Sequence, residues 1–463
     1  MFILRPYQEK AVNAGLEIIQ SKKNGLLVLP TASGKSLVIA EIVRRSNLKS
    51  IVLQPSIEIL KQNLEKIKAF GMTDIGIFSA SMDEKTIGKV TIATIGSIIK
   101  HKEKFKHFEL IIVDEADLVN SKGGQYEDFI NSLGLPVIGT TASPYRMRYY
   151  MNSFGNGEPV VESRILTRTR PRIFSTIKHI TQIPEMFEMG YLCALKYDID
   201  NTYDSKKVKS NSTGQGYDEK ALLSYNQSQN IISKIIGTVK KSTAKHILIF
   251  TQFREESEQV INELLKLKIN CEEISGVTKK KDREDILRRF RLGEICVVNV
   301  GVLVAGYDFP ELDHIIIARP TKSLRLFVQM SGRGLRVASG KKYCLLSDLC
   351  DNVKRFGEIN SFVIEDVSDG KGLWRLKSNK GYLTGINIIT GKDLEQRQKT
   401  TKKEKKQALS GDLLIPFGKY NGTKLSELDK SYMQWCSENF DKKNKWRQIF
   451  KAEIIRRCER NNN

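Results

Sequence analysis

The sequence predicts an α/β fold with two consecutive parallel sheets, followed by a small C-terminal module. Two observations support this fold class. Short apolar runs alternate with helix-like patterns twice along the chain, over residues 1–150 and 231–367. The runs are almost continuously apolar, which is typical of strands buried on both faces of a parallel sheet. With 463 residues, the chain is long enough for several domains that each bury a core.

Each block contributes a series of expected elements. In the first block we expect strands at residues 25–29, 50–54, 75–79, 90–94, 110–113 and 137–141, and helices at 6–21, 35–46, 57–70 and 125–133. In the second block we expect strands at 246–253, 271–275, 295–300, 314–318 and 343–347, and helices at 255–267, 280–292 and 324–330. Alternation at this spacing favours sheets covered by helices on both faces. Two blocks of similar size predict paired domains with a cleft between them.

The rest of the chain divides into a connector at residues 151–230, a basic linker at 368–411 and a small module at 412–463. The linker contains a cluster of lysines at positions 402, 403, 405 and 406. In the module, the aromatic residues Phe417, Tyr420 and Trp435 have two interpretations. They form the core of a tiny domain, which we favour, or they are exposed and stack on nucleobases.

Composition limits the classes of function. The net charge is +22, and the residues from Gly370 onward contribute +12 of it, which favours a polyanionic partner such as nucleic acid. No run of about 18 apolar residues predicts a membrane span, and the N-terminus lacks the pattern of a signal peptide. The seven cysteines are scattered without a CxxC pair, so we expect reduced thiols rather than zinc. These observations predict a cytoplasmic protein, in the host cytoplasm if it is phage-encoded.

The residues after the first strand have the composition of a phosphate-binding loop. Between that strand and the next helix stand Pro30, Thr31, Ala32, Ser33, Gly34, Lys35 and Ser36. Gly34 would let backbone amides approach phosphates, Lys35 would neutralise β- and γ-phosphate oxygens, and Ser36 can bind Mg²⁺. Leu29 and Ala32 replace glycines of the general pattern.

An acidic pair follows the strand expected at residues 110–113. Asp114 is suited to hold Mg²⁺, and Glu115 is suited to polarise a water molecule. Asp114 and Glu115 stand 79 residues after Lys35 and Ser36. Together, the phosphate-binding loop and the acidic pair predict a nucleotide-hydrolysing site.

The two motifs resemble those of the superfamily 2 helicases and translocases, and the resemblance extends from Arg5 to Arg336. It implies two RecA-like domains of the P-loop NTPase class, with ATP and Mg²⁺ as cofactors. Arg5 and Gln8 lie in a segment that resembles the adenine-reading element of this family. Gly306 and Asp308 lie in a segment that resembles motif V and would approach ATP.

The segment of residues 329–336 resembles motif VI of the same family and adds Gln329, Arg333 and Arg336 to the catalytic set of Lys35, Asp114 and Glu115. Arg333 and Arg336 are three residues apart, a helical spacing that would project both from one face. The resemblance implies that they cross the cleft to the γ-phosphate as arginine fingers.

The resemblance also implies contacts with a nucleic-acid backbone. The protein groups would bond to its phosphates and would not read its bases. The residues implied are Pro55, Ser56, Thr94, Ser97, Phe253 and Asn299. Motif VI opens with Gln329, and motif III contains Thr-Ala-Ser at residues 141–143. Both features are more similar to the DNA-directed bacterial and phage repair or restriction-type group than to DEAD-box RNA helicases. Replication, recombination or restriction proteins are candidate partners.

The sequence therefore predicts an ATP- and Mg²⁺-dependent DNA helicase or translocase. Two alternatives stay open: an RNA helicase, and a duplex-DNA translocase subunit of a restriction or defence complex. A nucleic-acid-binding scaffold with a decayed ATP site is disfavoured by the intact acidic and arginine residues.

Overall fold

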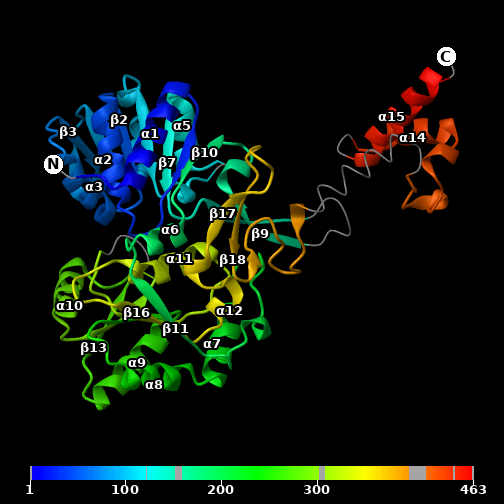
Figure 1. Ribbon diagram of the computed structural model, residues 1–463. Helices are drawn as coiled ribbons and strands as arrows, with labels where there is room; N and C mark the ends of the chain where they lie inside the picture. The colour runs from blue at the N-terminus through cyan, green and yellow to red at the C-terminus, as the bar shows by residue number, and fades with distance from the viewer. Residues whose placement is uncertain are drawn as a thin grey trace. The chain divides into compact units, whose positions relative to one another are not determined.

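The computed structural model describes residues 3–120, 123–151, 159–301, 308–395, 413–441 and 444–460. Contacts divide the chain into two compact units, Met1–Ile389 and Thr390–Asn463. The larger unit holds two lobes, one blue to cyan and one green to yellow in Figure 1. The predicted α/β class with two large parallel sheets is confirmed, and the predicted strands and helices lie within two residues of their expected ends. Within the described ranges, no helix is long and apolar enough to cross a bilayer.

The first lobe contains a sheet with the strand order β10-β1-β7-β6-β2-β5-β3-β4. Its strands are β1 (Gly25–Val28), β2 (Ser50–Gln54), β3 (Ile75–Ser79), β4 (Glu84–Lys85), β5 (Val90–Thr94), β6 (Leu110–Asp114), β7 (Val137–Thr141) and β10 (Thr176–Ile180). Its helices are α1 (Pro6–Ser21), α2 (Lys35–Ser46), α3 (Ile57–Ala69), α4 (Ile95–Ile98) and α5 (Gln125–Leu133). The pairings are parallel except that of β3 with β4. Strands β1, β2, β6 and β7 are buried at every position, because helices cover both faces of the sheet.

The strand order brings three separate parts of the sequence to one edge of this sheet. Strand β7 pairs with β1 on one side and with β6 on the other, with Val28 opposite Thr141 and Asp114 opposite Thr140. Because parallel strands end at the same edge, the loop after β1, the acidic pair after β6 and the hydroxyls of β7 must meet there.

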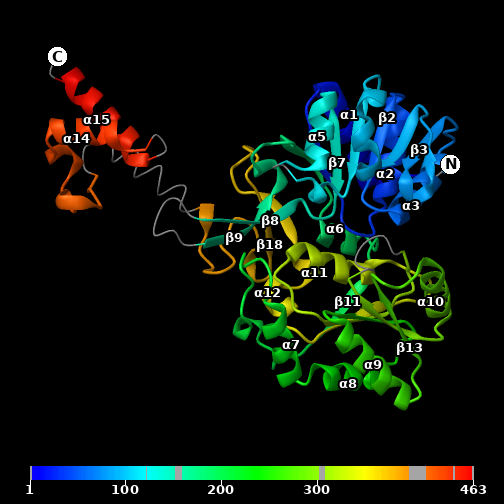
Figure 2. The same cartoon turned by 180° about the vertical axis from the view of Figure 1, so that it is seen from behind.

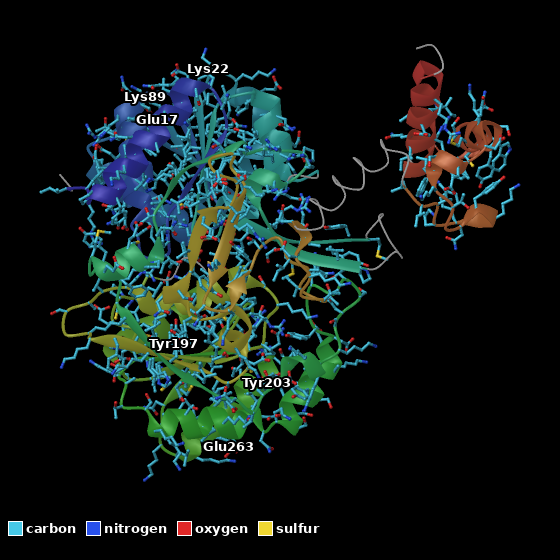
Figure 3. The ribbon with its side chains drawn as sticks, turned by 45° about the vertical axis from the view of Figure 1, so that its right-hand side comes forward. Glu17, Lys22, Lys89, Tyr197, Tyr203 and Glu263 are labelled. Atoms are coloured by element: carbon cyan, nitrogen blue, oxygen red, sulfur yellow. The ribbon has the colours of Figure 1, made fainter. Side chains whose placement is uncertain are left out.

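The second lobe has a parallel sheet with the strand order β11-β16-β15-β12-β14-β13. Its strands are β11 (Ala194–Ile199), β12 (Ile247–Thr251), β13 (Cys271–Ser275), β14 (Cys296–Val300), β15 (His314–Ala318) and β16 (Tyr343–Asp348). Its helices are α7 (Glu219–Ser228), α8 (Ile231–Lys241), α9 (Arg254–Lys266), α10 (Lys280–Leu292), α11 (Leu324–Ser331) and α12 (Asn352–Phe356). Figure 3 places Tyr197 and Tyr203 within this lobe, where Tyr197 Oη accepts a hydrogen bond from the Ile359 amide (3.0 Å) and Tyr203 Oη donates one to Asn226 Oδ1 (2.7 Å).

The segment that we assigned to a connector contributes an edge strand to each sheet. Strand β10 pairs with β1 in the first lobe, and β11 pairs with β16 in the second. Between them lies the short helix α6 (Ile183–Glu188), which both views place between the lobes (Figures 1 and 2). Strand β9 (Pro159–Ile165) of this segment pairs antiparallel with β8 (Tyr145–Met151), which lies almost wholly before it.

Residues that follow the second sheet return to the first lobe. Strands β17 (Val363–Asp366), β18 (Trp374–Ser378) and β19 (Gly381–Tyr382) form an antiparallel sheet, part of which falls in the range that we assigned to a linker. The side chain of Gln182 exchanges hydrogen bonds of 2.8 and 3.1 Å with the backbone of Ile364, and the Ile388 amide donates to the Val161 carbonyl (2.7 Å). One continuous apolar cluster therefore runs from the first lobe through Met186, Leu192 and Leu376 into the second.

The smaller unit contains α14 (Lys430–Asn439) and α15 (Lys445–Arg460), preceded by turns around Gly418–Tyr420 and Leu425–Glu427. Its buried core consists of Ile415, Leu425, Leu428, Met433, Cys436 and Phe450. Arg457 fastens α15 to the preceding turns, since its guanidinium donates to the carbonyls of Leu425 and Leu428, both at 2.8 Å.

Candidate active site

The loop between β1 and α2 has the backbone conformation of a phosphate cradle. Ala32 and Gly34 both lie in the left-handed region, with φ of +69° and +77°. Glycine is favoured at position 34, because its φ of +77° strains other residues and a Cβ atom there would displace the Gln8 amide, which would stand 2.7 Å away. Ala32, which replaces a glycine of the family pattern, bears a strain of about 1–2 kcal/mol. Helix α2 begins directly after this loop, so its first amides face the position that a phosphate would take.

The segment from Arg5 to Gln8 braces this loop. Tyr7 Oη and Gln8 Nε2 each donate a hydrogen bond of 2.8 Å to the Ser33 carbonyl, and Gln8 Oε1 accepts one from the Arg5 amide at 2.9 Å. The Arg5 guanidinium lies 4.2 Å from the ring centroid of Tyr191. Gln8 is buried, and its amide already bonds to the protein on both sides; its contact with adenine stays a prediction.

The acidic pair lies beside Lys35. Lys35 Nζ is 3.6 Å from Asp114 Oδ1 and forms a close ion pair with Glu115. Asp114 is buried and accepts hydrogen bonds from Thr140 Oγ1 (3.0 Å) and Asn63 Nδ2 (3.1 Å). Glu115 has a left-handed backbone, with φ of +52°, which turns the chain as it leaves β6. Three side chains from three elements, Lys35 on α2, Asn63 on α3 and Thr140 on β7, therefore orient the two carboxylates.

Burial and charge act differently on the two carboxyl groups. Burial raises the pKa of Asp114, and the charge of Lys35 only partly offsets this effect. Burial opposes ionisation of Glu115 as well, but Lys35, followed by Arg325 and Arg333, lowers the pKa of Glu115 below its ordinary value. The same acidic residues raise the pKa of Lys35 despite its burial. Glu115 is thus held ionised, while Asp114 lacks enough positive charge around it.

The donor atoms at this edge fit Mg²⁺. Asp114 provides a carboxylate, and Ser36 provides a hydroxyl at the first turn of α2; both are hard oxygen ligands. In the described part of the chain, no group of three or more His, Cys, Asp or Glu side chains could hold a metal. Mg²⁺ suits such a sparse site, because it usually binds one or two carboxylates together with phosphates and water.

The second lobe presents Gln329, Arg333 and Arg336 around the end of α11. The predicted helical spacing of the two arginines is wrong. The α-helix ends at Ser331, a 3₁₀ turn covers Gly332–Leu335, and Arg336 has an extended backbone, with ψ of 135°. Two glycines, at positions 332 and 334 on either side of Arg333, favour this early end. Arg336 Nε lies 2.5 Å from Asp308 Oδ1. This ion pair orients the Arg336 side chain, in place of the helical arrangement that the spacing predicted.

Arg333 is buried, with only 5% of its surface exposed. Burial lowers the pKa of its guanidinium, the charge of Arg336 adds to this effect, and Glu115 and Asp308 offset it only in part. Burial also lowers the pKa of Arg336. Both guanidinium groups would therefore gain from a nearby anion. The charge of Arg333 adds to that of Lys35 in lowering the pKa of Glu115, so Arg333 acts electrostatically on the acidic pair of the other lobe.

Two further contacts cross between the lobes. Arg325 Nε, on α11, forms a close ion pair with Asp117, whose other carboxylate oxygen accepts a hydrogen bond from Thr141 Oγ1 at 2.6 Å. A Cβ atom on Gly332 would stand 3.0 Å from the side chain of Thr31 in the phosphate loop. Sequence reasoning missed Arg325 and Asn63. Arg325 stands four residues before Gln329, a helical spacing that could have indicated it.

The residues predicted to contact nucleic acid lie at or after strand ends. Thr94 Oγ1 and Ser97 Oγ are 2.9 Å apart, and Ser56 caps α3 by accepting a hydrogen bond from the Ile59 amide at 3.4 Å. Pro55 and Phe253 are half-buried, and Asn299 is fully buried at the end of β14. Gly306 lies at 302–307, outside the described residues. These contacts stay predictions.

Known protein families match both lobes. The model of the type III restriction enzyme res subunit matches residues 1–146, and the helicase conserved C-terminal domain matches residues 227–338. IRC3 of Saccharomyces cerevisiae, which carries the name of an ATP-dependent helicase, is 26% identical over 375 residues, 75% of this chain and 51% of IRC3. The DNA 3'-5' translocase XPB2 of Sulfurisphaera tokodaii is 25% identical over 360 residues, 72% of this chain and 78% of XPB2. This chain thus spans about half the length of IRC3.

Solved structures share the fold. The ATP-dependent type ISP restriction-modification enzyme LlaBIII, bound to DNA, has a TM-score of 0.55 at 18% identity, over 75% of this chain and 28% of that chain. A fragment named as an HsdR subunit of a type I restriction enzyme from Vibrio vulnificus has a TM-score of 0.57 at 17% identity, over 77% and 66%. These likenesses concern the pair of RecA-like domains.

Proposed function

We propose that this chain is a superfamily 2 helicase or translocase that couples ATP hydrolysis to movement on, or unwinding of, DNA. One observation carries the proposal. Lys35 of the first lobe pairs with Glu115, and Gly332, next to Arg333 in the second lobe, lies against Thr31 of the phosphate loop, while the charge of Arg333 lowers the pKa of Glu115. A cradle on one lobe and a cation on the other at the same acidic residue are the parts that phosphoryl transfer requires.

Each residue has a role in this proposal. The loop amides and Lys35 hold the β- and γ-phosphates, so that Lys35 exchanges its carboxylate partner for phosphate oxygens. Glu115, released from Lys35, accepts a hydrogen bond from the attacking water and orients it. Asp114 and Ser36 would hold Mg²⁺, which would neutralise charge on the phosphate oxygens. Arg333 and Arg336 stabilise the charge that develops on the γ-phosphate.

Closure of the lobes would then gate hydrolysis. Arg325 of the second lobe pairs with Asp117 of the first, and Asp117 accepts a hydrogen bond from Thr141 on β7. The preceding residue of that strand, Thr140, donates a hydrogen bond to Asp114. A change in the distance between the lobes therefore reaches the Mg²⁺ ligand through two hydrogen bonds and one strand. In this way turnover of ATP would drive movement of one lobe relative to the other.

DNA is the proposed substrate. The chain carries a net charge of +22, which suits a polyanion but does not select DNA over RNA. The preference for DNA rests on the motif series and on the relatives, since XPB2 is named a DNA translocase.

A second candidate function is the motor of a restriction or defence complex that moves on duplex DNA without separating its strands. The match of residues 1–146 to a restriction-enzyme subunit favours it. Both candidates share the ATP site and differ in the nucleic acid that stimulates it.

The test is an ATPase panel with single-stranded DNA, duplex DNA, forked DNA and RNA at two salt concentrations. We expect DNA to stimulate the ATPase. The affinity for single-stranded DNA should fall as the salt concentration rises, with a slope of the log–log plot of about −0.7 per phosphate contact. Stimulation by duplex without strand displacement would favour the restriction-type motor. Stimulation by RNA alone would contradict the choice of DNA, and no ATPase with any nucleic acid would contradict the proposal.

A further inference from the structure

The aromatic side chains of the C-terminal module separate into two groups. The first group belongs to its core. Phe417 lies 5.3 Å from Trp446 and 5.8 Å from Phe440, and Trp446 lies 5.6 Å from the buried Phe450. The predicted core role is confirmed for Phe417 and in part for Tyr420, which packs against the core, and it is wrong for Trp435, which is exposed.

The second group forms a row on the surface, which we call the aromatic face: Tyr420, Tyr432 and Trp435. Adjacent ring centroids are 4.5 and 6.5 Å apart, and the planes of Tyr432 and Trp435 differ by only 20°. The two tyrosines rest partly on the core, whereas 55% of the Trp435 surface is exposed. Tyr432 and Trp435 are three residues apart on α14, which projects both from the same side of the helix.

Positive charge accompanies this face. Lys419 Nζ lies 4.9 Å from the ring centroid of Tyr420 and 5.9 Å from that of Tyr432. Residues 413–460 contain 11 Lys and Arg against 6 Asp and Glu. Two acidic residues lie three positions along the chain from this face: Glu438 accepts a hydrogen bond from Gln434 at 3.4 Å, and Asp429 caps α14 by accepting one from the Ser431 amide at 2.6 Å.

We propose that the aromatic face stacks on unpaired bases of a single-stranded nucleic acid, with Lys419 bound to a neighbouring phosphate. Every base offers a flat π-face, so a row of rings binds a strand without selecting its sequence. A duplex hides these faces within its own stack. The charge complementarity at Lys419 favours this occupant over a second copy of the basic module, which would bring like charges together. The inference does not depend on ATP hydrolysis.

The first test reads the tryptophans separately. The full chain labelled with 5-fluorotryptophan gives ¹⁹F resonances for Trp374, Trp435 and Trp446, which single Trp→Phe variants assign. We expect a 15-residue oligo(dT) or oligo(U) to move the Trp435 resonance and leave that of Trp446 in place; the two oligonucleotides show which sugar is accepted. No movement with either, or equal movement with a blunt duplex or with heparin, would overturn the proposal. So would a concentration-dependent movement without nucleic acid, which would indicate a second copy.

The second test compares substitutions at one exposed position. Trp435→Leu keeps apolar volume without a π-face and should weaken single-strand binding about 5- to 150-fold, whereas Trp435→Phe should retain most of it. Lys419→Gln should remove one phosphate contact. The slope of log affinity against log salt concentration should therefore become shallower by about 0.7. An unchanged Trp446 resonance shows that each variant is folded. Equal affinities of the Leu and Phe variants would refute stacking. The Lys35→Ala protein separates this inference from the proposed ATPase. Its Trp435 resonance should still move when the oligonucleotide is added, although its ATPase activity is lost.

Discussion

Removal of the charge on Arg325 should uncouple the lobes without unfolding either of them. Arg325 belongs to the second lobe and Asp117 to the first, so their ion pair exists only when the lobes are together. Arg325→Met keeps the length of the side chain and removes the charge. The Asp117 carboxylate, whose side chain is fully buried, would then keep only the hydrogen bond from Thr141. Burial already raises the pKa of Asp117, and Arg325 opposes that effect, so the variant would favour a protonated Asp117.

The size of the effect follows from the exposure of the pair. Breaking a fully buried pair costs about 3–5 kcal/mol. Because 30% of the Arg325 side chain is exposed, water screens its charge, and we expect about 1–3 kcal/mol. This loss weakens the closed arrangement alone. The steady-state ATPase rate on saturating DNA should therefore fall about 5- to 150-fold, while the thermal unfolding midpoint changes little.

A double-mutant cycle with Asp117→Asn tests this reasoning. In the Asp117→Asn protein, Arg325→Met should cost almost nothing further, which gives a coupling energy of about 1–3 kcal/mol. Arg288→Met is the matched control, because Arg288 pairs with Asp285 on an exposed surface of one lobe. Additive effects of the two substitutions, or an ATPase rate for Arg325→Met within about twofold of the parent, would refute the coupling.

Three further predictions concern the site and the second lobe. Lys35→Ala and Glu115→Gln should each abolish ATP turnover and leave DNA binding measurable by fluorescence anisotropy; retained ATPase in both would contradict the assigned roles. Arg333→Ala should lower the ATPase rate by about 10³- to 10⁵-fold with ATP binding retained, which nucleotide titration and single-turnover kinetics can separate. His314 is fully buried, and burial lowers its pKa to about 4 from 6.5, so the unfolded chain binds this proton more strongly. The free energy of unfolding should therefore fall as pH drops below about 6.5, by about 2 kcal/mol from this group between pH 7.5 and 5, and urea titrations of His314→Gln should lack that part of the loss.

The sequence by itself determined the two sheets and the chemistry at their edges. Strands buried on both faces have nearly continuous apolar runs, so their positions were evident without coordinates. Lys35, Asp114 and Glu115 were found because each directly follows such a strand or its loop. In a parallel sheet, residues at these positions must lie at the carboxyl edge.

Only the tertiary structure decided how distant segments pair. Nothing local in the connector indicates that β10 and β11 join different sheets, because edge strands are selected by the space beside existing strands. Likewise Arg325 and Asp117 are 208 residues apart, and their contact depends on how the lobes pack. The spacing of Arg333 and Arg336 misled for a related reason: a periodic pattern assumes that the helix continues, whereas its end was fixed by two glycines and by the pairing of Arg336 with Asp308. Periodicity reports short-range geometry, and contacts between remote residues arise only when the chain has collapsed around a shared core.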